Sequence, residues 1–158
     1  MPVFSTTGSK HSDFWLADGA QDFGWLRGGL VEGFNQPAPI RLHVGNAAFG
    51  QVHIDIRHGH WIQRQNTTTP ELAWAKLQYP AQLYEAIPVG RLAFSFRFSP
   101  ASVMIVEWKQ GGSYFSIFTM YSHPNRPIDG RSLGRYKPLT NPKEFLDKVD
   151  EAKEKADQ

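Results

Sequence analysis

The chain has 158 residues, of which 41% are hydrophobic and 20% charged, and its formal net charge is +2. These values are typical of one globular domain that buries roughly two-thirds of the surface of its unfolded chain. Because the chain contains no cysteine, disulfide bonds, thiolate metal sites and a cysteine nucleophile are excluded. No signal-peptide pattern opens the sequence, and no apolar run reaches the roughly 20 residues of a membrane-spanning helix.

Glycine, aspartate and aromatic residues are abundant in the first part of the chain. We expect residues 1–38 to form an irregular extension, in which DFGWLRGGLVEGF (residues 22–34) is compatible with a short helix. The next segment, PIRLHV (residues 39–44), alternates apolar and polar side chains, which predicts a strand.

A helix is predicted in AFGQVHIDIRHGHW, residues 48–61. Phe49, Val52 and Ile56 have the i, i+3, i+7 spacing of one apolar stripe. Gly59 is placed to end this helix.

Three histidines and an arginine crowd the same helix. On an ideal helix, His53, Arg57 and His60 lie close to the predicted stripe, so we expect them to border the core and face the sheet. His58 would project to another side.

The rest of the chain predicts one more helix, then strands. TTTPELAWAKL (residues 67–77) has Thr69 as a cap and Pro70 at the first helical position. RLAFSFRF, SVMIVEW and SYFSIFTMY alternate as strands, and KQGG marks a hairpin between the last two. In NPKEFLDKVDEAKEK, Asn141 and Glu144 form a capping box that predicts a C-terminal helix.

Helices followed by antiparallel strands predict an α+β fold. We expect N-terminal helices packed on a four-stranded or slightly larger antiparallel sheet, with a C-terminal helix at the end. The single domain, residues 1–158, would comprise the extension 1–38, a core 39–121, a basic loop 122–140 and the C-terminal helix 141–158. The basic loop carries Arg126, Arg131, Arg135 and Lys137 against Asp129 alone, which would favour a polyanionic ligand or form a solvated surface.

The histidine helix allows three interpretations. Zinc sites on helices usually pair ligands at i and i+4, so the five-residue step from His53 to His58 is a poor metal motif. A histidine beside a core can also be a structural hydrogen-bonding group. Acid–base chemistry fits better, because histidine titrates near neutrality and Arg57 can hold a phosphate in two-point contact.

The strings PIRLHVG, FGQVHIDIRHG, RLAFSF and YFSIFTMY together resemble the phage and polymorphic-toxin branch of the barnase–EndoU–colicin–RelE ribonuclease superfamily. The likeness covers residues 39–121. It implies two helices on an antiparallel sheet whose exposed face binds RNA. It also implies that His53 is the catalytic histidine, that Arg57 and His58 complete the helix motif, and that Ser116, Thr119 and Tyr121 match the polar strand positions. Ala48 departs from the commoner glycine, and residues after Tyr121 have no counterpart.

In a regular strand, Thr119 shares a face with Tyr121, and Ser116 points to the other face. Either one of Ser116 and Thr119 is structural or a bulge intervenes. We favour Thr119 and keep Ser116 as an alternative. The acid could come from His58, Tyr121 or His123.

The sequence therefore predicts a metal-independent endoribonuclease toxin that uses no cofactor and acts in the cytoplasm of a target or host bacterium. Such a protein, monomeric when free, could be delivered within a larger secreted or phage-borne protein, and a cognate immunity protein or antitoxin would neutralise it. The alternatives are a non-catalytic RNA-binding module and a protein-interaction module. The side chains expected to bind RNA are Arg91, Arg97, His123, Arg126, Arg131, Arg135 and Lys137.

Overall fold

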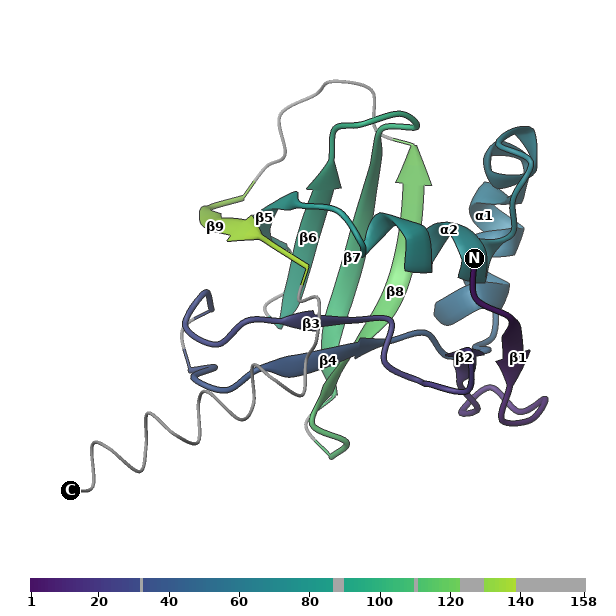
Figure 1. Ribbon diagram of the computed structural model, residues 1–158, viewed down its shortest axis with the longest axis horizontal. Coiled ribbons are helices and arrows are strands. Elements are labelled where there is room, and N and C mark those ends of the chain that lie inside the picture. The colour runs from purple at the N-terminus through teal and green to yellow at the C-terminus, as the bar shows by residue number, and fades with distance from the viewer. Residues whose placement is uncertain (32, 87–89, 110, 123–129, 139–158) are drawn as a thin grey trace.

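The computed structural model describes residues 1–31, 33–86, 90–109, 111–122 and 130–138. These residues contain two helices and nine strands (Figure 1). The predicted α+β class is confirmed. In chain order, the elements are β1 (Phe4–Thr6), β2 (Trp15–Ala17), β3 (Gly24–Leu26), β4 (Ala38–Arg41), α1 (Gly50–Arg64), α2 (Thr69–Lys76), β5 (Ala81–Ala86), β6 (Arg91–Phe96), β7 (Ser102–Lys109), β8 (Tyr114–Ser122) and β9 (Ser132–Tyr136).

Seven strands form one mixed sheet in the order β3-β4-β8-β7-β6-β5-β9, and β1 pairs with β2 separately. Strands β6 to β8 form the predicted antiparallel meander, and β5, which was not predicted, extends it by pairing with β6. The sheet is larger than expected, and it is not wholly antiparallel, because β4 pairs in parallel with β8 at Ile40 opposite Phe115. Parallel pairing needs a long crossover, and here both helices and three strands separate β4 from β8. Figure 1 shows β3 and β4 running across β6, β7 and β8.

Residues 1–38 are more regular than the sequence suggested. The short helix expected in residues 22–34 is wrong, since β3 lies there and pairs with β4. The strand is favoured because pairing with β4 places Phe23 and Leu26 in the core. Four glycines in the same thirteen residues also disfavour a helix, each by about 1 kcal/mol relative to alanine.

Helix α1 is longer than predicted and is turned differently. It continues through Gly59 to Arg64, because the residues beyond Gly59 include Ile62, which joins the core. Ile54 faces inward with 0% exposure, whereas Ile56 is 64% exposed. At about 100° per residue these two positions lie far apart around the helix axis. The predicted stripe through Ile56 therefore does not face the core.

Helix α2 begins where its sequence predicts, within one residue. Thr68, rather than Thr69, occupies the cap position, and Pro70 follows in the first turn. Thr69 is buried, and its hydroxyl donates a hydrogen bond to the Asp55 carboxylate on α1. Leu72 and Leu77 join the core beneath this helix. No helix in the described ranges combines the length and the apolar character needed to cross a membrane.

The two faces of the meander differ in polarity. Leu92, Phe94 and Phe96 of β6 are buried in the core, as their alternation predicts. Their neighbours in β6, and the positions opposite those neighbours in β7 and β8, lie on the other face. This outer face carries Arg91, Ser95, Glu107, Ser116, Thr119 and Tyr121.

The predicted basic loop, residues 122–140, contains a strand. Residues Ser132–Tyr136 form β9 and pair with the edge strand β5. Tyr136 is buried, and its hydroxyl donates a hydrogen bond to the carbonyl of Leu77 at 2.6 Å. Tyr136 therefore anchors β9 to the core. The predicted C-terminal helix, residues 141–158, lies outside the described residues.

Candidate active site

A tight turn fixes the start of α1 against the end of β4. Gly45 and Gly50 both have positive φ angles, of 75° and 76°. A Cβ atom on Gly45 would lie 2.1 Å from the carbonyl oxygen of Phe49, so only glycine fits there. The amide of Val52 donates to the carbonyl of Val44 at 3.0 Å, which uses a helix N–H that has no partner within the helix. The position of the first turn of α1 is thereby set.

His53 lies in the first turn of α1, and two contacts hold its half-buried ring. Its Nδ1 is 2.9 Å from the carbonyl oxygen of Ala47. Because a carbonyl can only accept, Nδ1 carries the proton and the neutral ring keeps a lone pair on Nε2. The ring also stacks on Phe118 of β8, with centroids 5.2 Å apart. His53 thus has the tautomer and the restrained ring that a general base needs.

His58 joins His53 along β8, although its position on an ideal helix predicted that it would project to another side. Its half-buried ring lies 5.7 Å from the ring of Tyr121. Burial lowers the pKa of His58 below its usual value, and the nearby His53 and Arg57 lower it further. Burial also raises the pKa of Tyr121, so this phenol keeps its proton. The structure therefore brings together three of the predicted catalytic residues.

A β-bulge in β8 resolves the alternative left open for Ser116 and Thr119. Residues 105 and 106 of β7 lie opposite Thr119 and Ile117, so Phe118 is an extra residue. The extra residue shifts the alternation by one position. Ser116 and Thr119 consequently share the outer face.

Thr119 has an unusual hydrogen-bonding state. It is 7% exposed, and its Oγ1 has no hydrogen-bond partner within the described part of the chain. Buried hydroxyls are normally paired, because an unpaired one loses its bonds to water without replacement. Oγ1 of Thr119 is thus a buried hydroxyl without a partner among the described residues.

Arg91 and Glu107 complete the site, and sequence reasoning missed Glu107. The guanidinium carbon of Arg91 lies 4.1 Å from the centre of the Phe118 ring, and its Nε is 3.4 Å from a carboxylate oxygen of Glu107. Phe118 therefore links Arg91 on β6 with His53 on α1. Glu107 could not be singled out from the sequence, because its contact with Arg91 depends on the pairing of β6 with β7.

The other predicted site residues are distributed over the surface. Arg57 is exposed on α1, one turn after His53. Arg131 forms an ion pair with Glu85 at 2.8 Å, so its charge is engaged. Lys137 is exposed. Arg97 and Arg135 line a pocket at one end of the sheet. His123 and Arg126 lie outside the described residues.

Sequence reasoning also missed His43, which is 6% exposed. Its Nδ1 lies 3.1 Å from the carbonyl oxygen of Ser12, and its Nε2 lies 2.6 Å from the hydroxyl of Tyr114. The carbonyl can only accept, so Tyr114 donates to Nε2. The ring also stacks on Phe14 with centroids 4.3 Å apart. With both ring nitrogens engaged, His43 ties the N-terminal segment to β8.

Tyr114→Phe is expected to lower the free energy of unfolding by about 1–2 kcal/mol, because it leaves Nε2 of the buried His43 without its donor. Urea unfolding of the variant and the wild type measures this difference. Tyr79→Phe, which removes the hydroxyl of an exposed tyrosine, is the matched control and should leave the midpoint unchanged. Equal stability of all three proteins would contradict the pairing.

Acidification is expected to destabilise the protein through His43 and His58. Burial lowers the pKa of both imidazoles below 6.5. The unfolded chain then takes up protons more readily than the folded one, so stability falls as the pH drops through about 6.5 and continues to fall down to the folded pKa. The melting temperature should decrease across this window, and His43→Gln should reduce the slope. An unchanged slope would contradict the assignment to His43.

The function of this site has to be assigned from its geometry. Within the described residues, no three histidine, aspartate or glutamate side chains come together in a group that could hold a metal ion. The chain has no significant match among protein-family models, curated proteins or solved structures.

Proposed function

We propose that the chain is an endoribonuclease that cleaves RNA by attack of the substrate's own 2′-hydroxyl. The observation that carries the proposal is the setting of His53. Its Nδ1 proton is held by the Ala47 carbonyl, which leaves Nε2 as a base, and its ring packs on Phe118 beside Arg91. A base, a cation and an acid are enough for this reaction, since the nucleophile belongs to the substrate.

In the proposed reaction, Nε2 of His53 removes the proton of the 2′-hydroxyl as the 2′-oxygen bonds to phosphorus. The bond between phosphorus and the 5′-oxygen breaks, which leaves a 2′,3′-cyclic phosphate. Arg57, one turn after His53, and Arg91, beside Phe118, are the cations available for the phosphate oxygens. A guanidinium suits this role because it stays charged and offers two parallel donors.

The leaving 5′-oxygen must receive a proton, and Tyr121 is the better donor. Because the pKa of His58 is lowered, little of this imidazole is protonated near neutral pH. Tyr121 retains its proton, since burial raises its pKa, and an alkoxide is basic enough to take a proton from a phenol. We assign the acid to Tyr121 and assign His58 to the positioning of its ring.

Two features support membership of the barnase–EndoU–colicin–RelE superfamily branch that the sequence resembles. The chain order α1, α2, then four antiparallel strands β5 to β8 is compatible with that resemblance. The residues of its helix and strand motifs lie next to each other at His53–Phe118 and His58–Tyr121. On this proposal the protein is a toxin that acts in the bacterial cytoplasm. In the cell that produces the toxin, an immunity protein or antitoxin covers the site.

Incubation of the purified protein with total RNA in EDTA tests the proposal. Cleavage in EDTA is the expected result, together with growth arrest when the chain is expressed without an inhibitor. Binding without cleavage would favour the non-catalytic RNA-binding module instead. Cleavage that requires added metal, or no interaction with RNA, would contradict the mechanism.

A further inference from the structure

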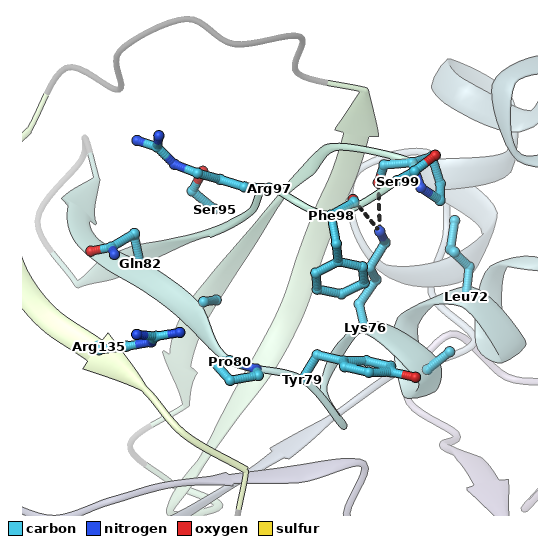
Figure 2. Close-up of a pocket in the computed structure, with 13 residues that line it drawn as sticks. Leu72, Lys76, Tyr79, Pro80, Gln82, Ser95, Arg97, Phe98, Ser99 and Arg135 are labelled. Carbon is cyan, nitrogen blue, oxygen red and sulfur yellow. Dashed lines mark hydrogen bonds between the residues drawn. The ribbon is translucent and has the colours of Figure 1, made fainter.

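A pocket lies at the end of the sheet where β6 ends and β5 begins, next to the C-terminal end of α2. Its volume is about 560 Å³, within the usual range for small-molecule sites. Figure 2 shows the rings of Phe98 and Tyr79 on one side of it and the guanidinium groups of Arg97 and Arg135 on the other.

The aromatic side of the pocket is open to solvent. Tyr79 is 54% exposed and Phe98 is 36% exposed, and their ring centroids are 4.8 Å apart. Among the described residues, these two are the large aromatic side chains that are exposed to solvent. Exposed rings of this kind are platforms on which nucleic-acid bases stack, with about 1–3 kcal/mol gained per base.

The opposite side of the pocket is positively charged. Arg97 and Arg135 are exposed, and neither forms an ion pair with a carboxylate in the described ranges. Lys76 lies beneath the rings with 1% exposure; its ammonium group donates to the carbonyls of Phe98 and Pro100. None of the described residues that line the pocket is acidic. Its charge therefore complements an anion.

The pocket and the candidate active site lie on one row of the sheet. Arg135, Gln82, Ser95, Val103 and Tyr121 are successive register partners across β9, β5, β6, β7 and β8. Neighbouring strands are about 4.8 Å apart, so this row spans roughly 19 Å. Tyr121 at one end of the row and Arg135 at the other are therefore a few nucleotide lengths apart.

We propose that this pocket binds one nucleotide of the RNA substrate, a few nucleotides away from the scissile phosphate. The base stacks on Tyr79 and Phe98, the amide of Gln82 bonds to its edge, and Arg97 and Arg135 hold the adjacent phosphate. The inference rests on the proposed ribonuclease function and adds a subsite that selects and anchors the substrate. An acidic peptide would match the charge but would gain nothing from two exposed aromatic rings.

The lysine beneath the rings provides a second indication of the ligand's charge. Desolvation lowers the pKa of Lys76 to about 8. A phosphate beside the pocket would favour the charged ammonium form and raise this pKa. Binding of a nucleotide near pH 8 should therefore be accompanied by proton uptake.

Cleavage kinetics on two substrates test the subsite. Tyr79→Ala and Arg135→Ala should each raise the KM for a single-stranded oligonucleotide at least tenfold. Both should leave cleavage of a dinucleoside phosphate unchanged, because it is too short to reach the pocket. Arg64→Ala removes an exposed charge at the end of α1, away from the pocket, and serves as the matched control. Equal KM values for all four proteins on the oligonucleotide would overturn the inference.

Binding of adenosine 5′-monophosphate, measured by NMR titration, separates failure of the subsite from failure of the proposed reaction. If the wild type binds this nucleotide at the pocket but cuts no RNA, the ribonuclease proposal fails and the nucleotide site remains. If it cuts RNA but Tyr79→Ala and Arg135→Ala bind the nucleotide as the wild type does, the subsite proposal fails. A poly-glutamate peptide that binds the pocket more tightly than the nucleotide would also overturn it.

Discussion

Replacement of His53 by alanine is expected to slow RNA cleavage by roughly 10²- to 10⁴-fold, the usual contribution of a general acid or base. The protein should stay folded, because the half-buried ring loses one hydrogen bond to the Ala47 carbonyl, worth about 1 kcal/mol, and its stacking on Phe118, worth about 0.5–1.5 kcal/mol. Initial rates on a fluorogenic RNA, with the folded fraction measured by circular dichroism, test the prediction. His60→Ala, which removes an exposed histidine from the same helix, should retain the full rate.

A second variant separates the base from the hydrogen bond. In His53→Asn, the amide can still donate to the Ala47 carbonyl, but no group replaces Nε2 as a base. We expect this variant to be as inactive as His53→Ala, with a melting temperature closer to that of the wild type. If both variants are less stable and their folded fractions cut RNA at the normal rate, His53 is a structural residue.

The second large effect concerns the orientation of α1. Ile54→Ala is expected to lower the free energy of unfolding by about 2–5 kcal/mol, because it leaves a cavity in the core. Ile56→Ala, two positions further along the same helix, should change it by less than about 0.5 kcal/mol, since Ile56 is exposed. Urea denaturation measures both values. Equal losses, or a larger loss for Ile56→Ala, would contradict the orientation of the helix.

This pair of isoleucines also shows where sequence reasoning was insufficient. Apolar residues occur on two sides of α1, and three of them, Phe49, Val52 and Ile56, have helical spacing by themselves. The core uses the other side: Ile54 and Ile62 are buried there, and α1 packs on both β8 and α2. Helical periodicity gives the spacing of a face, but the partner that covers it decides which face is buried.

Strand predictions were more reliable than the helix orientation. The alternation of Leu92, Phe94 and Phe96 gave the buried face of β6 correctly, because a period of two leaves only two possible faces. The short connections correctly indicated the antiparallel meander of β6 to β8, but β5 was missed. The parallel contact of β4 with β8 could not be inferred, since it joins segments that are more than 70 residues apart.

The candidate site was predictable as a set of residue types, and its geometry was not. His53, His58 and Tyr121 follow from motifs within one helix and one strand. Their meeting depends on the bulge at Phe118 and on the packing of α1 along β8. The approach of Arg91 to Phe118 depends on pairing across three strands, which no local pattern encodes.

The most direct measurement of the proposed reaction is the chemistry of the cut ends. An RNA oligonucleotide is digested in EDTA, and a second one carries a single 2′-deoxynucleotide on the 5′ side of the cut; mass spectrometry identifies the products. We predict 2′,3′-cyclic phosphate and 5′-hydroxyl ends from the first and no cleavage at the substituted position of the second. Ends with a 3′-hydroxyl and a 5′-phosphate, or cleavage next to the 2′-deoxynucleotide, would contradict attack by the 2′-hydroxyl.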